Sequence, residues 1–283
     1  MPIWTRRPRH QELVCPDRDR RGTLLDPQGE LARSRCLGYL TPAVDEVHVW
    51  CVSLSDAATH PSRLRGSLSP DEISRAERFH RSRDREHFTA RRGLLREILA
   101  SYVKARPADL CFSYGAHGKP ALAARPGERS VSFNLSHSHG LVLYAITAER
   151  AVGIDLERVR DGVECEQIAA RFFSPSERSA FAALPLADRQ AAFFRAWTRK
   201  EAYIKATGRG LSQPLDEFEV PVAPDQPAQL LSDRGDPAAP RRWSFQDLRP
   251  AEGYAAALAV EGHGWQLICR SWPQAAASGR DDV

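Results

Sequence analysis

FSPSERSAFAAL, residues 173–184, begins with the same Ser-Pro-x-Glu pattern as LSPDEISRAERF at residues 68–79. In the earlier stretch, Ser69 is expected to cap a helix and Pro70 to be its first residue. Glu72, three positions after the serine, would complete a capping box. Both stretches therefore predict a short helix with the same beginning.

The two helices belong to a longer repeat with an offset of 105 positions. The pairs at this offset are Ser69 and Ser174, Phe88 and Phe193, and Val47 and Val152. Hydrophobic periodicity predicts strands at 47–54, 151–159 and 254–260, two strands around a small polar bend within 130–147, and helices at 68–79, 85–103, 173–184 and 191–208. We therefore expect an α+β fold of two similar halves related by pseudo-two-fold symmetry, with a ligand between them.

The predicted halves are residues 45–148 and 149–272. Residues 1–44 hold eight arginines and five acids and are expected to form a basic, poorly ordered extension, and residues 273–283 a flexible tail. The rest of the chain, with 32 basic and 31 acidic residues, lacks the basic bias of a nucleic-acid-binding core. Six scattered cysteines without a CxxC pair favour reduced thiols in the cytoplasm and argue against a zinc site. No apolar run is long enough to span a membrane.

The stretch GIDLE places Asp155 and Glu157 two positions apart on a predicted strand. Side chains at this spacing point to the same face, so the two carboxylates would repel one another unless water or a cation separates them. Hard oxygen ligands suit Mg²⁺. A solvated strand end is the alternative explanation.

The stretch AWTRKEAYIKATGRG, residues 196–210, places Glu201 four positions after Trp197 and four before Lys205, on one helical face. If this helix packs beside the GIDLE strand, Glu201 becomes a third carboxylate and Lys205 can meet phosphate oxygens. The set would suit transfer of a phosphoryl-type group. The alternative is a surface ion pair of Glu201 and Lys205.

The first half offers groups that can bind anions. They are Ser136, His137 and Ser138 of SHS, Lys119 of GKP, Arg92 at the position equivalent to Trp197, and Arg75 and Arg78 on the preceding helix. An ordinary solvated face would explain any one of these arginines equally well.

The motifs FNLSHS, VGIDLE, FFSPSE, WTRKEAYIKATGRGLS and GKP resemble, in order and spacing, those of the 4'-phosphopantetheinyl transferases. The resemblance covers about residues 45–265 and is greatest to the large, pseudo-two-fold monomeric type that activates peptide and polyketide synthases. The GIDxE and WxxKExxxK pair is specific, whereas GKP or SHS alone would not be.

The resemblance implies that the phosphopantetheine arm of coenzyme A moves to a serine of an apo acyl or peptidyl carrier protein, releasing 3',5'-ADP. It implies that Asp155, Glu157 and Glu201 bind Mg²⁺, with Mn²⁺ as an alternative, and that Glu201 or a water on the metal takes the serine proton. Lys205 would stabilise the pyrophosphate. The adenosine phosphates would be held by Lys119, Ser136, His137 and Arg92, with Arg75 as a further 3'-phosphate contact. Some relatives carry a basic residue where this chain has Glu72.

Three other functions are compatible with the motifs: a coenzyme A binder without turnover, a Mg²⁺-dependent phosphohydrolase, and a nucleic-acid-binding protein that uses the basic extension. The three-acid set argues against the first, because binding alone does not require it. We expect a cytoplasmic monomer without membrane or nucleic-acid partners. The stretch RFHRSRDREHFTARR, residues 78–92, could meet an acidic carrier surface.

Overall fold

The computed structural model describes residues 40–54, 64–103, 105–123 and 130–272. Most of the predicted extension and all of the predicted tail lie outside these residues. The described part is a mixed α+β fold, which confirms the predicted class. No helix within it is both long and apolar enough to cross a membrane.

Within the described residues, the first half of the chain forms five strands and two α-helices. They are β1 (Glu46–Ser53), α2 (Pro70–Glu77), α3 (Ser82–Ala100), β2 (Phe112–Tyr114), β3 (Pro120–Leu122), β4 (Ser132–Ser138) and β5 (Leu141–Thr147). The second half contains β6 (Val152–Arg158), α4 (Cys165–Phe172), α5 (Pro175–Ala182), α6 (Leu186–Thr207), β7 (Phe218–Glu219), β8 (Ser232–Asp233), α7 (Ala239–Arg242), β9 (Trp243–Leu248), β10 (Tyr254–Glu261) and β11 (Gln266–Ser271).

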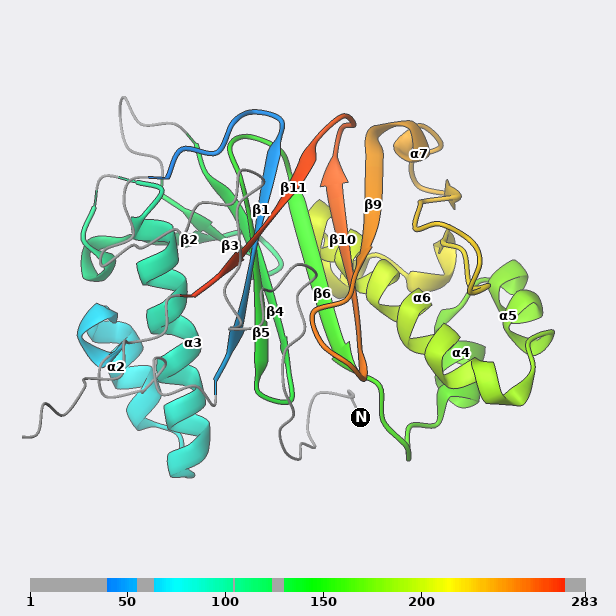
Figure 1. The fold of residues 1–283 in the computed structure, drawn as a ribbon, viewed down its shortest axis with the longest axis horizontal. Helices are drawn as coiled ribbons and strands as arrows, with labels where there is room; N and C mark the ends of the chain where they lie inside the picture. The colour runs from blue at the N-terminus through cyan, green and yellow to red at the C-terminus, as the bar shows by residue number, and fades with distance from the viewer. Residues whose placement is uncertain (1–39, 55–63, 104, 124–129, 273–283) are drawn as a thin grey trace, which may run out of the picture.

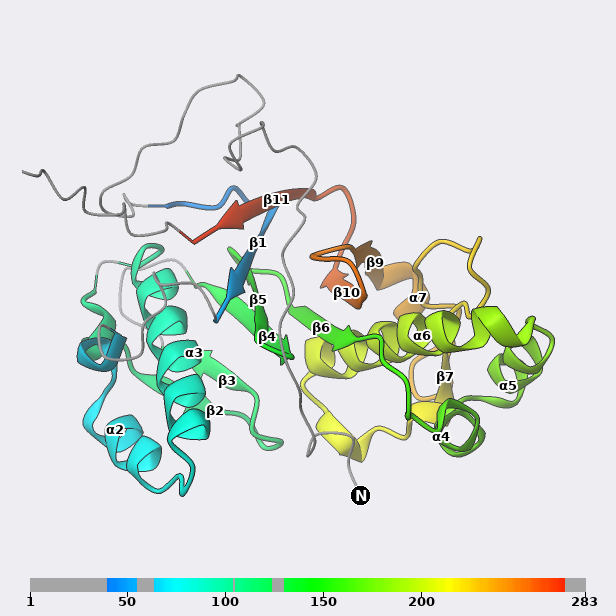
Figure 2. The ribbon, with the colours of Figure 1, turned by 60° about the horizontal axis from the view of Figure 1, so that its bottom comes forward.

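Two sheets occupy the middle of the molecule, with helices α2 and α3 on one flank and α4, α5 and α6 on the other (Figures 1 and 2). One sheet has the strand order β11-β1-β5-β4 and the other β6-β10-β9. The last strand, β11, follows the second sheet in the chain but pairs in parallel with β1 of the first. The C-terminal end of the described chain therefore ties the second half to the first.

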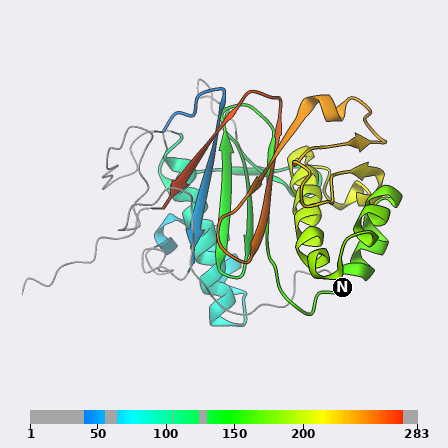
Figure 3. The ribbon, with the colours of Figure 1, turned by 45° about the vertical axis from the view of Figure 1, so that its right-hand side comes forward.

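Among the described residues, three hydrophobic clusters fill the space between these layers. One lies between α3 and the first sheet, one around α6 and the second sheet, and the third joins residues of both sheets, such as Val49 and Leu143 with Ile154 and Leu258. Strand β5 contributes Leu143 to the third core and Tyr144 to the first, so it is buried on both faces. Its uninterrupted apolar sequence reflects this position. Figure 3 shows α6, in yellow-green, beside the second sheet.

Both predicted capping boxes are confirmed. The backbone N–H of Ser69 donates to the Glu72 carboxylate at 3.2 Å, and that of Ser174 donates to Glu177 at 2.8 Å. The two capped helices have eight residues each at the predicted offset of 105. Symmetry between the halves beyond this repeat remains a prediction.

Candidate active site

Strands β4 and β6 lie beside each other, but they do not pair in any sheet of the described residues. Hydrogen bonds from side chains join them instead. The amide oxygen Oδ1 of Asn134 accepts from the backbone N–H of Ile154 at 3.0 Å. Farther along, the hydroxyl of Ser138 accepts from the backbone N–H of Arg158 at 3.1 Å. We call this contact between residues 132–138 and 152–158 the β4–β6 seam. Alternate residues of SFNLSHS face it because side chains of a strand alternate between its two faces.

The centre of the seam holds a three-residue contact of Ser136, Asp155 and Lys205. The hydroxyl of Ser136 donates to Oδ1 of Asp155 at 2.9 Å, and Nζ of Lys205 donates to the same oxygen at 2.6 Å. The lysine amine also lies 3.1 Å from the Ser136 hydroxyl. Asp155 is fully buried, so the predicted packing of the WTRKE helix against the GIDLE strand brings Lys205 to a desolvated carboxylate.

Two further carboxylates lie in the electrostatic field of Asp155. Oε2 of Glu157 accepts from the Ser138 hydroxyl at 3.2 Å, and both Glu157 and Glu201 are buried. Burial, reinforced by the neighbouring charge of Asp155, raises the pKa of Glu157 to about 7 and that of Glu201 to about 7. The charge of Lys205 acts in the opposite direction on each pKa but does not overcome burial. Both groups can therefore exchange a proton near neutral pH.

Gly153 allows β6 to approach α6 closely enough for these contacts. A Cβ atom at this position would lie 2.1 Å from the carbonyl oxygen of Ala202 and 2.3 Å from the backbone nitrogen of Ala206. Both atoms are main chain and cannot rotate away. The glycine of GIDLE thus sets the distance from which Lys205 reaches Asp155.

The other charged residues of WTRKE are structural. Lys200 is fully buried and donates to Oε2 of Glu177 at 2.8 Å and to the carbonyls of Leu215 and Phe218 at 2.7 and 2.6 Å. Arg199 makes a bidentate ion pair with Asp247. Trp197, which sequence spacing placed with Glu201, stacks on Phe193 in the core around α6.

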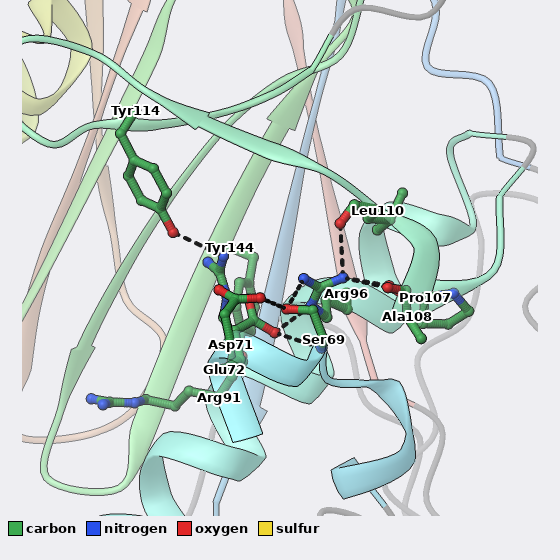
Figure 4. A network of polar contacts seen from close by, with 11 residues as sticks. Ser69, Asp71, Glu72, Arg91, Arg96, Pro107, Ala108, Leu110, Tyr114 and Tyr144 are labelled. Atoms are coloured by element: carbon green, nitrogen blue, oxygen red, sulfur yellow. Dashed lines mark hydrogen bonds and ion pairs between the residues drawn. The ribbon is translucent and has the colours of Figure 1, made fainter. Parts of the chain in front are cut away.

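In the first half, the capping carboxylate of Glu72 is shared by two arginines of α3. It accepts from Arg92, and from Nε of Arg96 at 2.5 Å. Arg96 is buried and also donates to Ser69 and to the carbonyls of Pro107 and Leu110 (Figure 4). Although burial acts to raise the pKa of Glu72, the hydrogen bonds from the two arginines hold it below its ordinary value.

The predicted anion-binding residues of the first half are spread over separate contacts. The Arg92 guanidinium lies 4.1 Å from the ring centre of Phe112 and donates to the Tyr114 hydroxyl at 3.2 Å. His137 contacts Arg91, which the sequence reasoning did not single out. Arg75 is exposed and lies over the Phe88 ring.

Lys119 makes contacts of its own. Its amine donates to the carbonyls of Val152 and Ala206 at 3.1 and 2.9 Å. The structure thus brings Ser136, Asp155, Glu157, Glu201 and Lys205 together, and places Arg75, Arg92, His137 and Lys119 in other contacts.

The donor set of the seam suits a hard divalent cation. Oδ2 of Asp155 is buried and has no hydrogen-bond partner among the described residues. The negative charge of Asp155 also acts on two nearby carboxylates, Glu157 and Glu201. Within residues 40–54, 64–103, 105–123 and 130–272, no three His, Cys, Asp or Glu side chains form a ready-made metal site. The carboxylates fit Mg²⁺ by oxygen chemistry and charge.

Comparison with known proteins gives consistent matches. The profile of the 4'-phosphopantetheinyl transferase superfamily matches residues 151–259, and the profile described as 4'-phosphopantetheinyl transferase, N-terminal, matches residues 59–149. The chain is 43% identical to 4'-phosphopantetheinyl transferase HetI of Nostoc sp., over 80% of this chain and 92% of that protein.

Two further relatives carry the same description. The putative 4'-phosphopantetheinyl transferase slr0495 of Synechocystis sp. is 37% identical over 60% of this chain and 68% of its own length. The 4'-phosphopantetheinyl transferase Sfp of Bacillus subtilis is 32% identical over 58% of this chain and 70% of its own length. With a relative this similar over nearly its whole length, and with a buried seam of serine, lysine and carboxylates where the matched halves meet, this chain belongs to the 4'-phosphopantetheinyl transferase family.

Proposed function

We propose that this chain transfers the 4'-phosphopantetheine arm of coenzyme A to a serine hydroxyl of an apo acyl or peptidyl carrier protein. The serine oxygen forms a bond to the phosphorus next to the pantetheine. The bond from that phosphorus to the oxygen of 3',5'-ADP breaks, and 3',5'-ADP leaves. The observation that carries this proposal is the seam, where Lys205 meets Asp155 and Ser136 beside two more buried carboxylates.

Asp155, Glu157 and Glu201 would hold Mg²⁺, with Mn²⁺ as an alternative. When bound, the ion would neutralise charge on the pyrophosphate of coenzyme A. The unpartnered Oδ2 of Asp155 supports this assignment, because a buried carboxylate oxygen without a donor is costly unless a cation meets it.

Glu201 would take the serine proton, directly or through water. In the metal-free protein, burial and the charge of Asp155 raise the pKa of Glu201 to about 7. Bound Mg²⁺ would favour the ionised carboxylate, which is the form that can accept a proton. Lys205 would stabilise the negative charge that grows on the departing phosphate, as a point charge already oriented by Asp155 and Ser136.

Arg92, His137, Ser136 and the exposed Arg75 would contact the adenosine phosphates of coenzyme A. Arg92 is oriented for such a role by Phe112 and Tyr114, although Glu72 also holds it. A phosphate would therefore compete with the Glu72 carboxylate for Arg92. Lys119 already donates to two carbonyls, so this proposal does not assign it to a phosphate.

The finer expectations from the sequence complete the proposal. The carrier would belong to a peptide or polyketide synthase, and the enzyme would work as a cytoplasmic monomer of two pseudo-symmetric halves, without a nucleic-acid or membrane partner. The matched capping boxes support the two-half description. The four cysteines that the structure describes, Cys51, Cys111, Cys165 and Cys269, form no disulfide with one another, which is compatible with a reducing compartment.

Intact-protein mass spectrometry tests the reaction. The full chain is incubated with coenzyme A, Mg²⁺ and a panel of apo acyl and peptidyl carrier proteins, with and without chelator. We expect one phosphopantetheine to be added to at least one carrier and the gain to disappear with chelator. Coenzyme A cleavage without carrier would instead favour a phosphohydrolase. Coenzyme A binding without any cleavage or transfer would contradict the proposed reaction.

The two raised pKa values predict how metal binding depends on pH. In the metal-free protein, Glu157 and Glu201 hold protons up to about pH 7, whereas the unfolded chain releases them near the ordinary value of 4.5. The stability that protonation gives is complete below pH 4.5 and is lost as the pH rises through 7. Mg²⁺ must displace these protons below pH 7 but binds free carboxylates above it.

We therefore expect Mg²⁺ to raise the midpoint of thermal unfolding more at pH 8 than at pH 5.5. At 100 times its Kd, the ion would add about 2.7 kcal/mol to the free energy of unfolding. This corresponds to roughly 5–11 °C at pH 8, with less than half of that shift at pH 5.5. Scanning fluorimetry across this range, with Na⁺ at equal ionic strength as control, measures the effect. An equal shift at every pH would mean that these carboxylates are not the ligands.

A further inference from the structure

Two motifs of the sequence, GKP at 118–120 and GRG at 208–210, find no part in the proposed chemistry, and the structure places them against each other. Lys119 lies in the connection between β2 and β3, in the first half. Gly208 ends α6 in a left-handed conformation with φ of 70°, in the second half. A Cβ atom on Gly208 would lie 3.4 Å from Cδ of Lys119.

A second contact lies beside the first. A Cβ atom on Gly210 would lie 3.0 Å from Cβ of His117, and the His117 ring nitrogen Nε2 lies 3.4 Å from the Ser212 hydroxyl. Residues 117–119 therefore rest on residues 208–212, and we call this contact the hairpin joint. It connects the halves at a place other than the β4–β6 seam.

The amine of Lys119 reaches through this joint to the contact between β6 and α6. It donates to the carbonyl of Val152 at 3.1 Å and to that of Ala206 at 2.9 Å. Val152 precedes Gly153, and the Ala206 nitrogen is one of the atoms that a Cβ on Gly153 would strike. The lysine thus bridges the strand and the helix next to the close contact at Gly153.

The position suits a cation for two physical reasons. Ala206 is the penultimate residue of α6, and carbonyls of the last helical turn lack partners within the helix. A positive charge there also complements the negative end of the helix dipole. Burial lowers the pKa of Lys119 to about 8, which agrees with an amine enclosed by protein rather than exposed to solvent.

We propose that Lys119 is a positioning residue, which holds the C-terminal end of α6 against β6 from the first half and so keeps Lys205 on Asp155. Lys205 directly precedes Ala206, and Asp155 lies three residues after Val152 on β6. The catalytic consequence rests on the proposed transfer reaction. The mechanical consequence, a helix end tied to the strand, does not.

The test compares Lys119→Met, which keeps a long apolar chain but loses the donors, with Lys119→Arg, which keeps both charge and donors. Arg106→Met is the matched control, because Arg106 is an exposed cation of the same half that pairs with Asp109, three residues away. Amide hydrogen exchange, read by mass spectrometry without substrate, follows peptides that cover residues 150–156 and 200–210. Steady-state transfer kinetics give kcat and the KM for coenzyme A.

We expect Lys119→Met to speed exchange in both peptides and to lower kcat by about 10–100-fold, since small misplacements of reacting groups have effects of this order. Its KM for coenzyme A should change less than about threefold on the same reasoning. Lys119→Arg should recover most of kcat, and Arg106→Met should match the parent protein. If Lys119 had only a structural role, hydrogen exchange would change without a fall in kcat at nearly constant KM.

Other results would overturn the proposal. A KM for coenzyme A that rises about tenfold or more, with kcat and exchange unchanged, would make Lys119 a phosphate contact instead. Unchanged exchange in both peptides would show that the lysine does not hold the helix end, whether or not the parent protein transfers phosphopantetheine. If the parent protein has no transferase activity but exchange is still faster in Lys119→Met, the proposed reaction is wrong. The role of Lys119 in holding the helix end would still be supported.

Discussion

Replacing Glu201 with glutamine is expected to lower kcat/KM for carrier modification by about 10²–10⁴-fold, the usual contribution of a general base. Glutamine has the same shape but can neither take the serine proton nor give a carboxylate to Mg²⁺. Time courses of carrier mass gain, with the parent enzyme diluted to bring both reactions into range, measure the ratio. Raising Mg²⁺ should not restore the rate, because on the proposed assignment the substitution would remove the base as well as the ligand.

The same substitution should leave the metal-free protein at least as stable as the parent at pH 8. Glu201 is buried and lies in the field of Asp155, so its ionised form is unfavourable without a cation. Thermal unfolding should therefore show an unchanged or higher midpoint in chelator, and a smaller rise with Mg²⁺. Glu166→Gln, on an exposed position of α4, is the control and should change neither activity nor midpoint.

Two results would count against this assignment of Glu201. Full activity of Glu201→Gln would remove the residue from the reaction. A midpoint lower by more than about 5 °C, a loss of more than about 1.3–2.5 kcal/mol, would mean that the carboxylate stabilises the fold rather than the reaction. The expected combination, loss of activity without loss of stability, is typical of a charge kept in an unfavourable place for function.

Sequence reasoning succeeded where the signal is local. The capping boxes of Ser69 and Ser174 involve residues three positions apart, so the pattern contains the whole contact. The alternation of GIDLE and the four-residue spacing of Glu201 and Lys205 also predicted which face of β6 meets which face of α6. The ion pair of Lys205 with Asp155 agrees with that prediction.

The rest of the site depends on contacts that no local pattern contains. Ser138 and Asn134 bind β6 across a seam between two sheets, and only their period-two spacing in FNLSHS could have indicated a shared face. Strand β11 was not predicted because its partner, β1, lies some 220 residues earlier in the chain. Trp197 shares a helical face with Glu201 by spacing alone, but packing directs its ring into the core.

Glu72 and Lys200 show a further limit. Sequence reasoning assigned Glu72 to a cap, and the structure shows the same carboxylate holding Arg92 and Arg96 as well. Glu177, the equivalent cap, holds Lys200. Each capping acid therefore has a second role set by the long helix that follows it. That role depends on how two helices pack, which the capping pattern does not specify.

Gly153→Ala is expected to prevent normal folding. The added methyl group would lie 2.1 Å from the carbonyl oxygen of Ala202 and 2.3 Å from the backbone nitrogen of Ala206, far inside contact distance. Relief requires β6 and α6 to separate, which opens the core around α6 and breaks the contact of Lys205 with Asp155. Overpacking that side chains can absorb costs about 1–3 kcal/mol, so we expect more than about 3 kcal/mol here.

Thermal unfolding of any soluble Gly153→Ala protein should thus begin at least about 6 °C lower, and its transfer activity should be undetectable. Gly66→Ala is the matched control, since a Cβ atom there would meet nothing within 4 Å and both properties should stay near those of the parent protein. A Gly153→Ala protein that unfolds within about 2 °C of the parent and keeps its activity would show that β6 and α6 do not need this close approach. If it were as stable as the parent but inactive, the glycine would serve the geometry of the seam and not the fold, because only the position of Asp155 against Lys205 would have changed.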